Sequence, residues 1–343
     1  MNAAVDAPWL QRQRQRLLAQ RGHAWLLQGP SGLGQYALGL SLAQAWLCEQ
    51  PTAAGACGVC DSCHLIVSRS HPDLVVLMPE TEMLERGWPL TESAQKDIDD
   101  KKRKPSKEIR VEAMRDMVGF AQRTSARGRG TAVLVYPAER MNTVTANALL
   151  KTLEEPAGDT RFVLASESAH QLLPTIRSRC QTHVMGWPSD EEATGWLLAQ
   201  AEAAGIKVGD GSPARVWLQA AGGRPEDALD WARAGLTAQR WSELPQSLAR
   251  GDWTLVSDWP ASQQLAVLQK LCHDLMSVAG GGAPRFFDAA SLPPAPRWGV
   301  LARWSKALLN DARTVEHPYN AGLMQEAWVA ATRQVLSRTP QGA

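Results

Sequence analysis

The sequence has no apolar run long enough to cross a membrane. A membrane-spanning helix needs about 18 or more consecutive apolar residues, and polar or charged residues interrupt every apolar stretch of this chain before that length. The N-terminal region is also polar, because Gln11-Arg-Gln-Arg-Gln-Arg16 stands where a secretory signal would need an apolar core. We therefore expect a cytoplasmic protein.

The sequence also lacks a strong charge of either sign. Its 36 Lys and Arg residues nearly balance 35 Asp and Glu residues, so the formal net charge is +1. The total charge therefore gives no electrostatic reason to expect nucleic acid or a membrane as a partner, and any basic surface must be local. With 343 residues and 44% hydrophobic content, the chain is long enough for two or three domains. Its 14 Trp residues are expected to pack in cores and interfaces.

A glycine-rich stretch, Gly29-Pro-Ser-Gly-Leu-Gly-Gln-Tyr36, lacks the two residues that give a phosphate-binding loop its chemistry. In such a loop, G-x-x-x-x-G-K-[ST], backbone N–H groups surround the phosphates, the Lys contacts the β- and γ-phosphates, and the hydroxyl holds Mg²⁺. Gln35 and Tyr36 stand in those places, so the charge and the small hydroxyl are both missing. Only the glycine frame remains, and its positions are Gly29, Gly32 and Gly34.

The surroundings of this stretch favour a phosphate-binding loop over a chance cluster of glycines. Residues 23–28 are typical of a short buried strand, and residues 37–50 are typical of a helix rich in Ala and Leu. Strand, glycine turn and helix is the order that such a loop requires. The alternative is a tight strand-to-helix turn with no nucleotide history.

Apolar segments rich in β-branched residues and Leu alternate with helical stretches in the first half of the chain. They lie at 24–27, 74–77, 132–136 and 162–165, with a shorter fifth at 182–185. This alternation predicts a parallel sheet with both faces covered. We therefore expect an α/β domain over residues 1–186. Residues 79–107 interrupt the pattern with Gly, Pro and a mixed charge run, which we interpret as a solvated polar loop rather than a DNA-binding arm.

Past Trp187 the pattern indicates helices alone. Ser189-Asp-Glu-Glu192 is a capping box that opens the first of them. The short helices over 187–237 suit a small lid domain. The longer ones over 238–343 suit a separate helical domain that carries oligomerisation.

Four of the six cysteines fall within sixteen positions, at Cys48, Cys57, Cys60 and Cys63. Two C-x-x-C steps let thiolates converge on one tetrahedral ion, so we predict a structural Zn²⁺ site with insert residues 48–63. A redox C-x-x-C pair is the alternative, but the intervening residues do not resemble a thioredoxin-type site. His71 is a reserve ligand. The other two cysteines, Cys180 and Cys272, are expected to be ordinary core residues.

Two further motifs carry a resemblance to a known family. Asn147-Ala-Leu-Leu-Lys-Thr-Leu-Glu-Glu-Pro156, followed by Ser178-Arg-Cys180, closely resembles the clamp-loader branch of the AAA+ proteins. This resemblance implies an AAA+ type parallel-sheet nucleotide-binding fold with a small helical lid and a C-terminal all-α collar. It implies a subunit of a bacterial DNA polymerase III clamp loader, with the gamma or tau ATPase subunits, the delta subunit, the sliding clamp and primer-template DNA as partners.

Compared with the ATPases of that family, the chain lacks a third group that ATP hydrolysis requires. The strand at 132–136 ends in Tyr136 and Pro137, where a family ATPase has an acidic pair that holds Mg²⁺ and orients water. Together with the missing Lys and hydroxyl, this predicts a subunit that does not hydrolyse ATP. We expect no ATP to be bound either, although passive binding at the loop stays open.

The resemblance also assigns a role to Arg179, at the centre of the Ser-Arg-Cys motif. It implies an arginine finger that acts in trans on the γ-phosphate held by a neighbouring subunit. The alternative is an Arg paired with a carboxylate of its own domain, and Arg177 is a nearby competitor for the finger role.

Two other functions agree less well with the sequence. An ATP-hydrolysing motor of the gamma or tau type conflicts with the missing residues. An independent zinc-dependent DNA-binding protein would need a basic surface lined with aromatic residues, which the near-zero net charge does not support.

Overall fold

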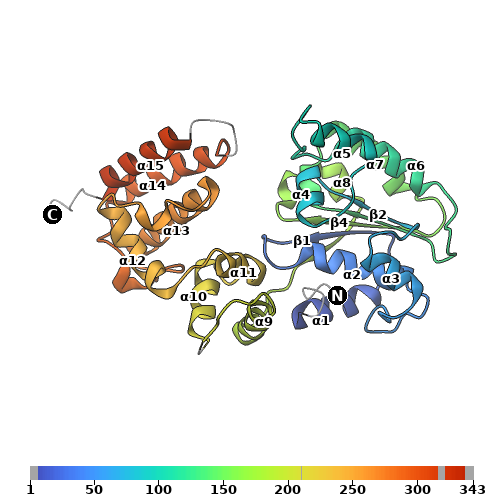
Figure 1. The fold of residues 1–343 in the computed structure, drawn as a ribbon, viewed down its shortest axis with the longest axis horizontal. Coiled ribbons are helices and arrows are strands. Elements are labelled where there is room, and N and C mark those ends of the chain that lie inside the picture. Colours follow the sequence, from blue (N-terminus) through green and yellow to red (C-terminus); the bar gives the residue numbers. More distant parts are fainter. Residues whose placement is uncertain (1–6, 210, 316–320, 337–343) are drawn as a thin grey trace. The chain divides into compact units, whose positions relative to one another are not determined.

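The computed structural model describes residues 7–209, 211–315 and 321–336, and Figure 1 shows the course of the chain. The chain forms two compact units, Met1–Glu192 and Ala193–Ala343. The first contains a sheet, and the described residues of the second form helices and turns. In the described ranges, every helix is too short or too polar to cross a lipid bilayer.

Five parallel strands form the sheet of the first unit, in the spatial order β2-β3-β4-β1-β5. The strands are β1 Ala24–Gln28, β2 Leu74–Leu77, β3 Thr131–Val135, β4 Thr160–Ser166 and β5 Gln181–Val184. Leu26 of β1 pairs with Leu164 of β4, and both are fully buried. The predicted α/β fold with a parallel sheet is therefore confirmed, and each predicted strand lies within about two residues of its observed bounds.

Helices cover both faces of this sheet (Figure 1), which explains why the middle residues of its central strands are apolar and buried. The helices of the first unit are α1 Pro8–Leu18, α2 Gln35–Leu47, α3 Asp61–Val67, α4 Glu80–Glu85, α5 Glu92–Asp99, α6 Val111–Ala121, α7 Thr143–Glu154 and α8 Pro174–Arg177. On one face α2 packs against β3 and β4, and on the other α6 packs against β2, β3 and α7. Met114, Leu149 and Phe162 are fully buried in the core between α6, α7 and the sheet.

Residues 79–107 differ from the solvated loop that the sequence predicted. They contain the helices α4 and α5, and three of their residues, Pro79, Glu80 and Trp88, are buried. Glu80 pairs with Arg103 at 2.5 Å and with Arg110 at 3.1 Å, so opposite charges of the mixed run neutralise one another within the segment and against α6. Periodicity could not show this, because the helices are short and are held by these ion pairs.

The helices from α9 onward match the helices predicted for the second half of the chain. They are α9 Asp190–Ala203, α10 Ser212–Ala220, α11 Pro225–Arg233, α12 Ala238–Ala249, α13 Ala261–Ala279, α14 Trp298–Ala312 and α15 Ala321–Leu336. The capping box forms as predicted, because the Glu192 N–H donates to the Ser189 hydroxyl at 3.2 Å and the Ser189 N–H donates back to the Glu192 carboxylate at 3.0 Å. The division into a lid over 187–237 and a collar over 238–343 stays a prediction.

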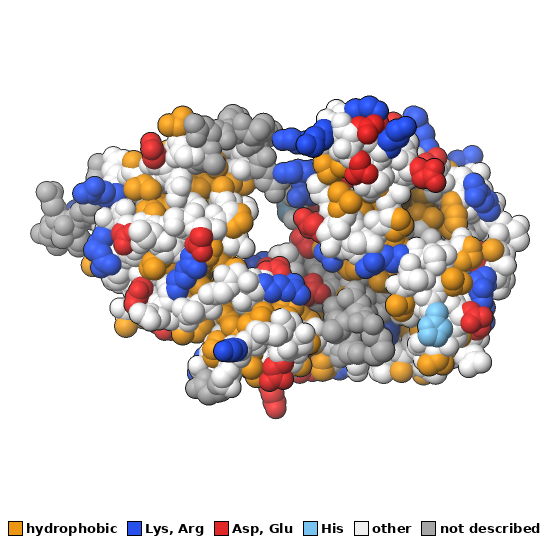
Figure 2. Space-filling view, viewed as in Figure 1, with side chains coloured by type: hydrophobic (Ala, Val, Ile, Leu, Met, Phe, Trp, Pro, Cys, Tyr) orange, Lys and Arg blue, Asp and Glu red, His pale blue; other side chains and the backbone are white. Residues whose placement is uncertain are grey.

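Tryptophans of the second unit pack against one another, as the composition suggested. The ring centre of Trp231 lies 5.7 Å from that of Trp241 and 5.0 Å from that of Trp259, and Trp241 stacks on Phe287 at 4.5 Å. On the surface, Figure 2 shows Lys and Arg side chains interspersed with Asp and Glu over the visible face, in line with the small net charge.

Candidate functional site

The glycine stretch lies between β1 and α2, in the order that a phosphate-binding loop requires. Gly32 and Gly34 have φ angles of 77° and 92°, a left-handed conformation that side chains rarely adopt. A Cβ added at Gly29 would lie 2.8 Å from the Cβ of Met185. The backbone therefore needs glycine at all three positions, whether or not a phosphate binds.

The side chain of Gln35 turns back onto this loop. It is buried, and its amide Nε2 donates to the carbonyl of Gly29 at 2.8 Å and to that of Pro30 at 2.7 Å. A lysine at this position of a working loop extends its charge to the β- and γ-phosphates. Here the replacing side chain has no charge and is bound to the loop itself.

Tyr36 stacks in a small group of aromatic and cationic side chains. Its ring centre lies 5.4 Å from that of Tyr136, and the guanidinium of Arg86 lies 4.5 Å from the Tyr36 ring centre and 4.9 Å from the Tyr136 ring centre. The Tyr36 hydroxyl accepts a hydrogen bond from the indole N–H of Trp88 at 2.7 Å. The phenol, at the sequence position where a working loop has a Ser or Thr to hold Mg²⁺, is therefore bound by a neighbouring side chain.

Tyr136, at the end of β3, is also held by its own hydroxyl. It donates to the Glu167 carboxylate at 2.8 Å. Burial raises the pKa of Tyr136 far above its usual range, and the nearby Glu167 carboxylate raises it further, so the phenol stays protonated. Burial likewise raises the pKa of Tyr36. Neither phenol can supply the anionic oxygen that an acidic pair would offer to a metal ion.

Sequence reasoning identified Gln35, Tyr36 and Tyr136, but it missed two side chains that contact Tyr36. Arg86 and Trp88 come from the segment 79–107, where the sequence predicts a solvated loop. The only available signal was the single Trp within that polar run, because an isolated Trp in a polar segment is more often packed than exposed.

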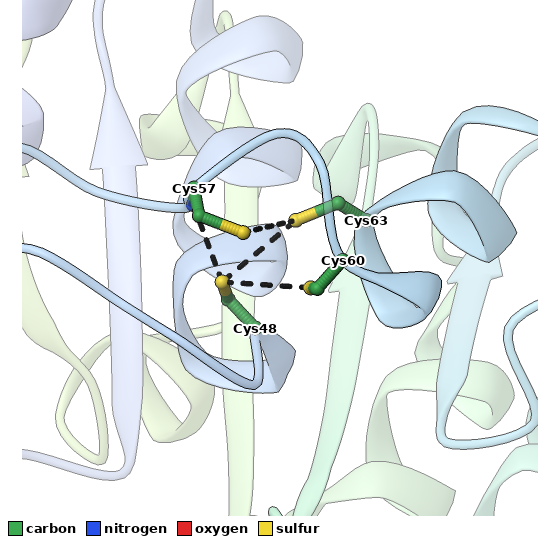
Figure 3. A group of neighbouring side chains, drawn as sticks. All are labelled: Cys48, Cys57, Cys60 and Cys63. Carbon is green, nitrogen blue, oxygen red and sulfur yellow. Dashed lines mark hydrogen bonds between the residues drawn. The ribbon is translucent and has the colours of Figure 1, made fainter.

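The four predicted cysteines converge (Figure 3). Cys48 follows α2, Cys57 and Cys60 lie in the loop before α3, and Cys63 lies in the first turn of α3. Their sulfur atoms all lie within 4.8 Å of one another. Cys48 Sγ lies 3.8 Å from Cys60 Sγ and from Cys63 Sγ, and Cys57 Sγ lies 4.0 Å from Cys63 Sγ.

These sulfur separations match a tetrahedral metal centre. Zinc–sulfur bonds of about 2.3 Å at tetrahedral angles place the sulfurs about 3.8 Å apart. A disulfide would bring two sulfurs to about 2.05 Å, and all four cysteines are free thiols. Backbone N–H groups of Val59 and Cys60 lower the pKa of Cys57 to about 6, whereas burial raises the pKa of Cys63 to about 12. The cluster could hold one metal ion and already contains one easily ionised thiol.

The reserve ligand His71 does not join this group. Its Nδ1 accepts a hydrogen bond from the backbone N–H of Asp73 at 3.0 Å, and the metal-ligating group found in the described residues consists of the four cysteines.

Polar contacts that the sequence did not reveal attach the cysteine insert to the sheet domain. Arg127 donates to Glu49 at 2.5 Å and to the Ser62 hydroxyl at 3.0 Å.

Arg179 follows α8, close to the start of β5. Its Nε donates to the Glu154 carboxylate at 2.6 Å, and its Nη1 donates to the Thr175 carbonyl at 2.8 Å. The side chain is 29% exposed. Glu154 is the last residue of α7, in the other motif of the resemblance, so the two motifs meet in this ion pair. Arg177, the competitor, is exposed.

Known proteins that this chain resembles include subunits of DNA polymerase III. The family model described as "DNA polymerase III, delta subunit" matches residues 10–186. A Pseudomonas aeruginosa DNA polymerase III subunit delta' is 35% identical over 288 residues, which is 78% of this chain and 79% of that protein. The Yersinia pestis subunit delta' is 28% identical over 332 residues, which is 90% of this chain and 87% of its own length.

The curated tau subunits match less of the chain. The Escherichia coli DNA polymerase III subunit tau is 33% identical over 158 residues, which is 46% of this chain and 20% of tau. Among solved structures, a DNA polymerase III gamma subunit-related protein of Thermotoga maritima gives a TM-score of 0.49 at 17% identity, over 96% of this chain and 100% of that one. The similarity to the Pseudomonas and Yersinia delta' subunits thus covers more of both partners than the similarity to tau.

Proposed function

This chain belongs to the family of DNA polymerase III delta' subunits, components of the clamp loader, and we propose that it acts there as the subunit that does not hydrolyse ATP. In this role it helps an ATP-driven complex to open the sliding clamp and load it on primed DNA. One observation carries the proposal: Gln35 and Tyr36 are bound to the chain's own atoms at the positions where an ATPase holds phosphate and Mg²⁺. A motor of the gamma or tau type would need both positions free.

The first test is nucleotide chemistry on the isolated chain. Steady-state phosphate release should show no turnover, and equilibrium dialysis with labelled ATP and Mg²⁺ should show no saturable binding. The variant Gln35→Lys should also stay inactive, because the metal hydroxyl and the acidic pair would still be absent. Turnover that a Gly34→Ala substitution abolishes would refute the proposal.

We further propose that Cys48, Cys57, Cys60 and Cys63 hold one structural Zn²⁺. Four protein thiolates occupy all four coordination positions of a tetrahedral zinc ion, so no position is left for a reactive water. The ion's contribution is to tie α2, the loop and α3 together. A cytoplasmic location suits this arrangement, because reducing conditions there keep cysteines as thiols.

Arg179 is proposed to complete the ATP site of a neighbouring ATPase subunit. The guanidinium is partly exposed and bound to Glu154, so in the assembled complex it would exchange that carboxylate for a γ-phosphate oxygen. Its planar, permanently charged fork suits both anions. This exchange distinguishes a finger from a permanent ion pair and can be tested by changing each partner.

The complex should therefore be reconstituted with Arg179→Ala, Arg179→Lys, Glu154→Gln and the control Arg177→Ala. Arginine fingers contribute on the order of 10³ to 10⁵ in rate at one site, and less in a loader with several sites. Arg179→Ala should reduce DNA-stimulated ATP hydrolysis and clamp loading while the complex still assembles. Arg179→Lys should restore little of the lost rate. Glu154→Gln and Arg177→Ala should keep the rate. Equal effects of Arg179→Ala and Glu154→Gln would leave only a structural ion pair.

The proposed partners are the gamma or tau ATPase subunits, the delta subunit, the sliding clamp and, through the complex, primer-template DNA. Oligomerisation is assigned to residues 238–343. In support, α14 and α15 carry the exposed apolar side chains Leu309 and Leu323. Light scattering of the chain mixed with its partners should give one defined complex. Leu309→Asp should weaken it, whereas Leu84→Asp, an exposed leucine of the first unit, should not.

A further inference from the structure

A groove of about 560 Å³ lies along α2, between that helix and the cysteine insert. Leu40 of α2 lines one side, and Val59, Ile66 and Val67 of the insert and α3 line the other. Figure 1 shows α2 and α3 as neighbours on the same side of the sheet. The groove belongs wholly to the first unit; Tyr36 is its one lining residue from the glycine stretch, and Arg179 does not line it.

Two aliphatic side chains of this groove face solvent. Val59 is 73% exposed and Val67 is 56% exposed. Val59 lies between Cys57 and Cys60, whose sulfurs belong to the converged cluster, so this apolar residue is presented from a segment that the cluster constrains. Exposed apolar side chains beside a concave surface are typical of a protein interaction site.

The charge of the groove has one sign. Arg14 and Arg69 both line it, and none of its described lining residues is Asp or Glu. Backbone carbonyls position both guanidiniums: Arg14 Nε donates to Ala54 O at 2.7 Å, and Arg69 Nη1 donates to Gly87 O at 2.8 Å. These contacts hold both guanidiniums at the groove.

We propose that this groove docks an extended segment of a partner protein in which one or two apolar side chains are flanked by carboxylates. The apolar anchors would lie against Leu40, Val59 and Val67, and the carboxylates would pair with Arg14 and Arg69. This inference goes beyond the clamp-loader role and does not rest on it.

The same lining does not suit nucleic acid. Single strands are held by exposed aromatic rings that stack with bases and by a row of cations along the backbone. The aromatic residues of the groove, Tyr36 and Trp88, are only 7% and 8% exposed and are hydrogen-bonded to each other. The exposed apolar surface is aliphatic, which favours a peptide.

The test uses the full-length chain and fluorescein-labelled heptapeptides, measured by fluorescence anisotropy. The probe has a central Leu-Leu pair flanked by Asp and Glu. Its controls have Lys and Arg flanks around the same pair, or the acidic flanks around a Ser-Ser pair, and a labelled thymidine oligonucleotide represents nucleic acid. The acidic probe with the Leu-Leu pair should bind at least about tenfold more tightly than each control.

Variants then locate the binding. Val59→Asp and Arg69→Glu should each weaken the acidic probe by about tenfold or more, whereas Arg123→Glu, an exposed arginine after α6, should not. The double variant Arg14→Glu with Arg69→Glu should bind the Lys and Arg peptide instead. That reversal is a result that misfolding cannot produce, and melting temperatures check folding independently. No saturable peptide binding, tighter oligonucleotide binding, or affinities unchanged by these variants would each overturn the proposal.

Discussion

The glycine loop and the cysteine cluster lie at opposite ends of α2, and their polar atoms are used in opposite ways. At the N-terminal end, the amide of Gln35 and the hydroxyl of Tyr36 are bound to groups of the same chain. At the C-terminal end, four sulfurs converge at separations that fit one tetrahedral ion. One site has the backbone of a binding loop without the ligand groups, and the other has a complete ligand set.

A loop can therefore keep the backbone geometry of a binding site after it has lost the groups that bind the ligand. The glycines of the loop satisfy constraints of the fold, since Gly29 lies against Met185 and Gly34 has a positive φ angle. Such constraints persist after nucleotide chemistry is lost. Four cysteines that converge have no comparable role in folding without a ligand, because close thiolates repel one another. The presence of all four therefore points to a metal more directly than the glycines point to a nucleotide.

The largest expected effect comes from removing one of the four proposed metal ligands. Cys60→Ser should lose the ion and destabilise the first unit by about 4 kcal/mol or more, because binding energy at a structural site is folding energy. In a unit of this size that corresponds to a fall of about 10 °C in melting temperature. Calorimetry of the variant measures the fall, and elemental analysis of the wild-type chain should give one zinc per chain.

The matched control is Cys180→Ser, which changes a cysteine outside the cluster that packs against the core. It should leave the zinc content at one per chain. A zinc content near zero in the wild-type chain, purified without added metal, would contradict the prediction. The cysteine cluster would then be a second site, like the glycine loop, that binds no ligand.

Local pattern predicted the elements and the cysteine cluster well. Apolar alternation located each strand, and the C-x-x-C spacing located a cluster whose ligands are separated by few residues. The contacts of Tyr36 were not predictable in the same way, because Arg86 and Trp88 reach it from about 50 residues away in a segment with no strong periodicity. Likewise, the Arg179–Glu154 pair joins two motifs that the sequence could name but not place in contact.

A smaller effect tests whether the tyrosine group really closes the loop site. Arg86→Met keeps the length of the side chain but removes the cation between the two rings and the 3.1 Å pair with Glu82. Each cation–π contact contributes about 0.5 to 2 kcal/mol, so the variant should lose about 2 kcal/mol in urea unfolding. Arg123→Met, which removes an exposed arginine, should lose less than about 0.5 kcal/mol. Equal losses would mean that the stack adds no stability.

The smallest expected effect is the most specific, because it concerns one hydroxyl. Tyr36→Phe keeps the ring that contacts Arg86 and Tyr136 but leaves the buried indole N–H of Trp88 without its 2.7 Å acceptor, which should cost about 1 to 2 kcal/mol. Trp88→Phe removes the donor, and the double variant should cost less than the sum of the two single variants, because no group is then left unsatisfied. Urea unfolding of all four proteins gives the coupling energy. A coupling near zero would mean that the Tyr36 hydroxyl is not held by Trp88 in solution and remains available to a metal ion, and the contrast between the two ends of α2 would then lose its basis at the loop.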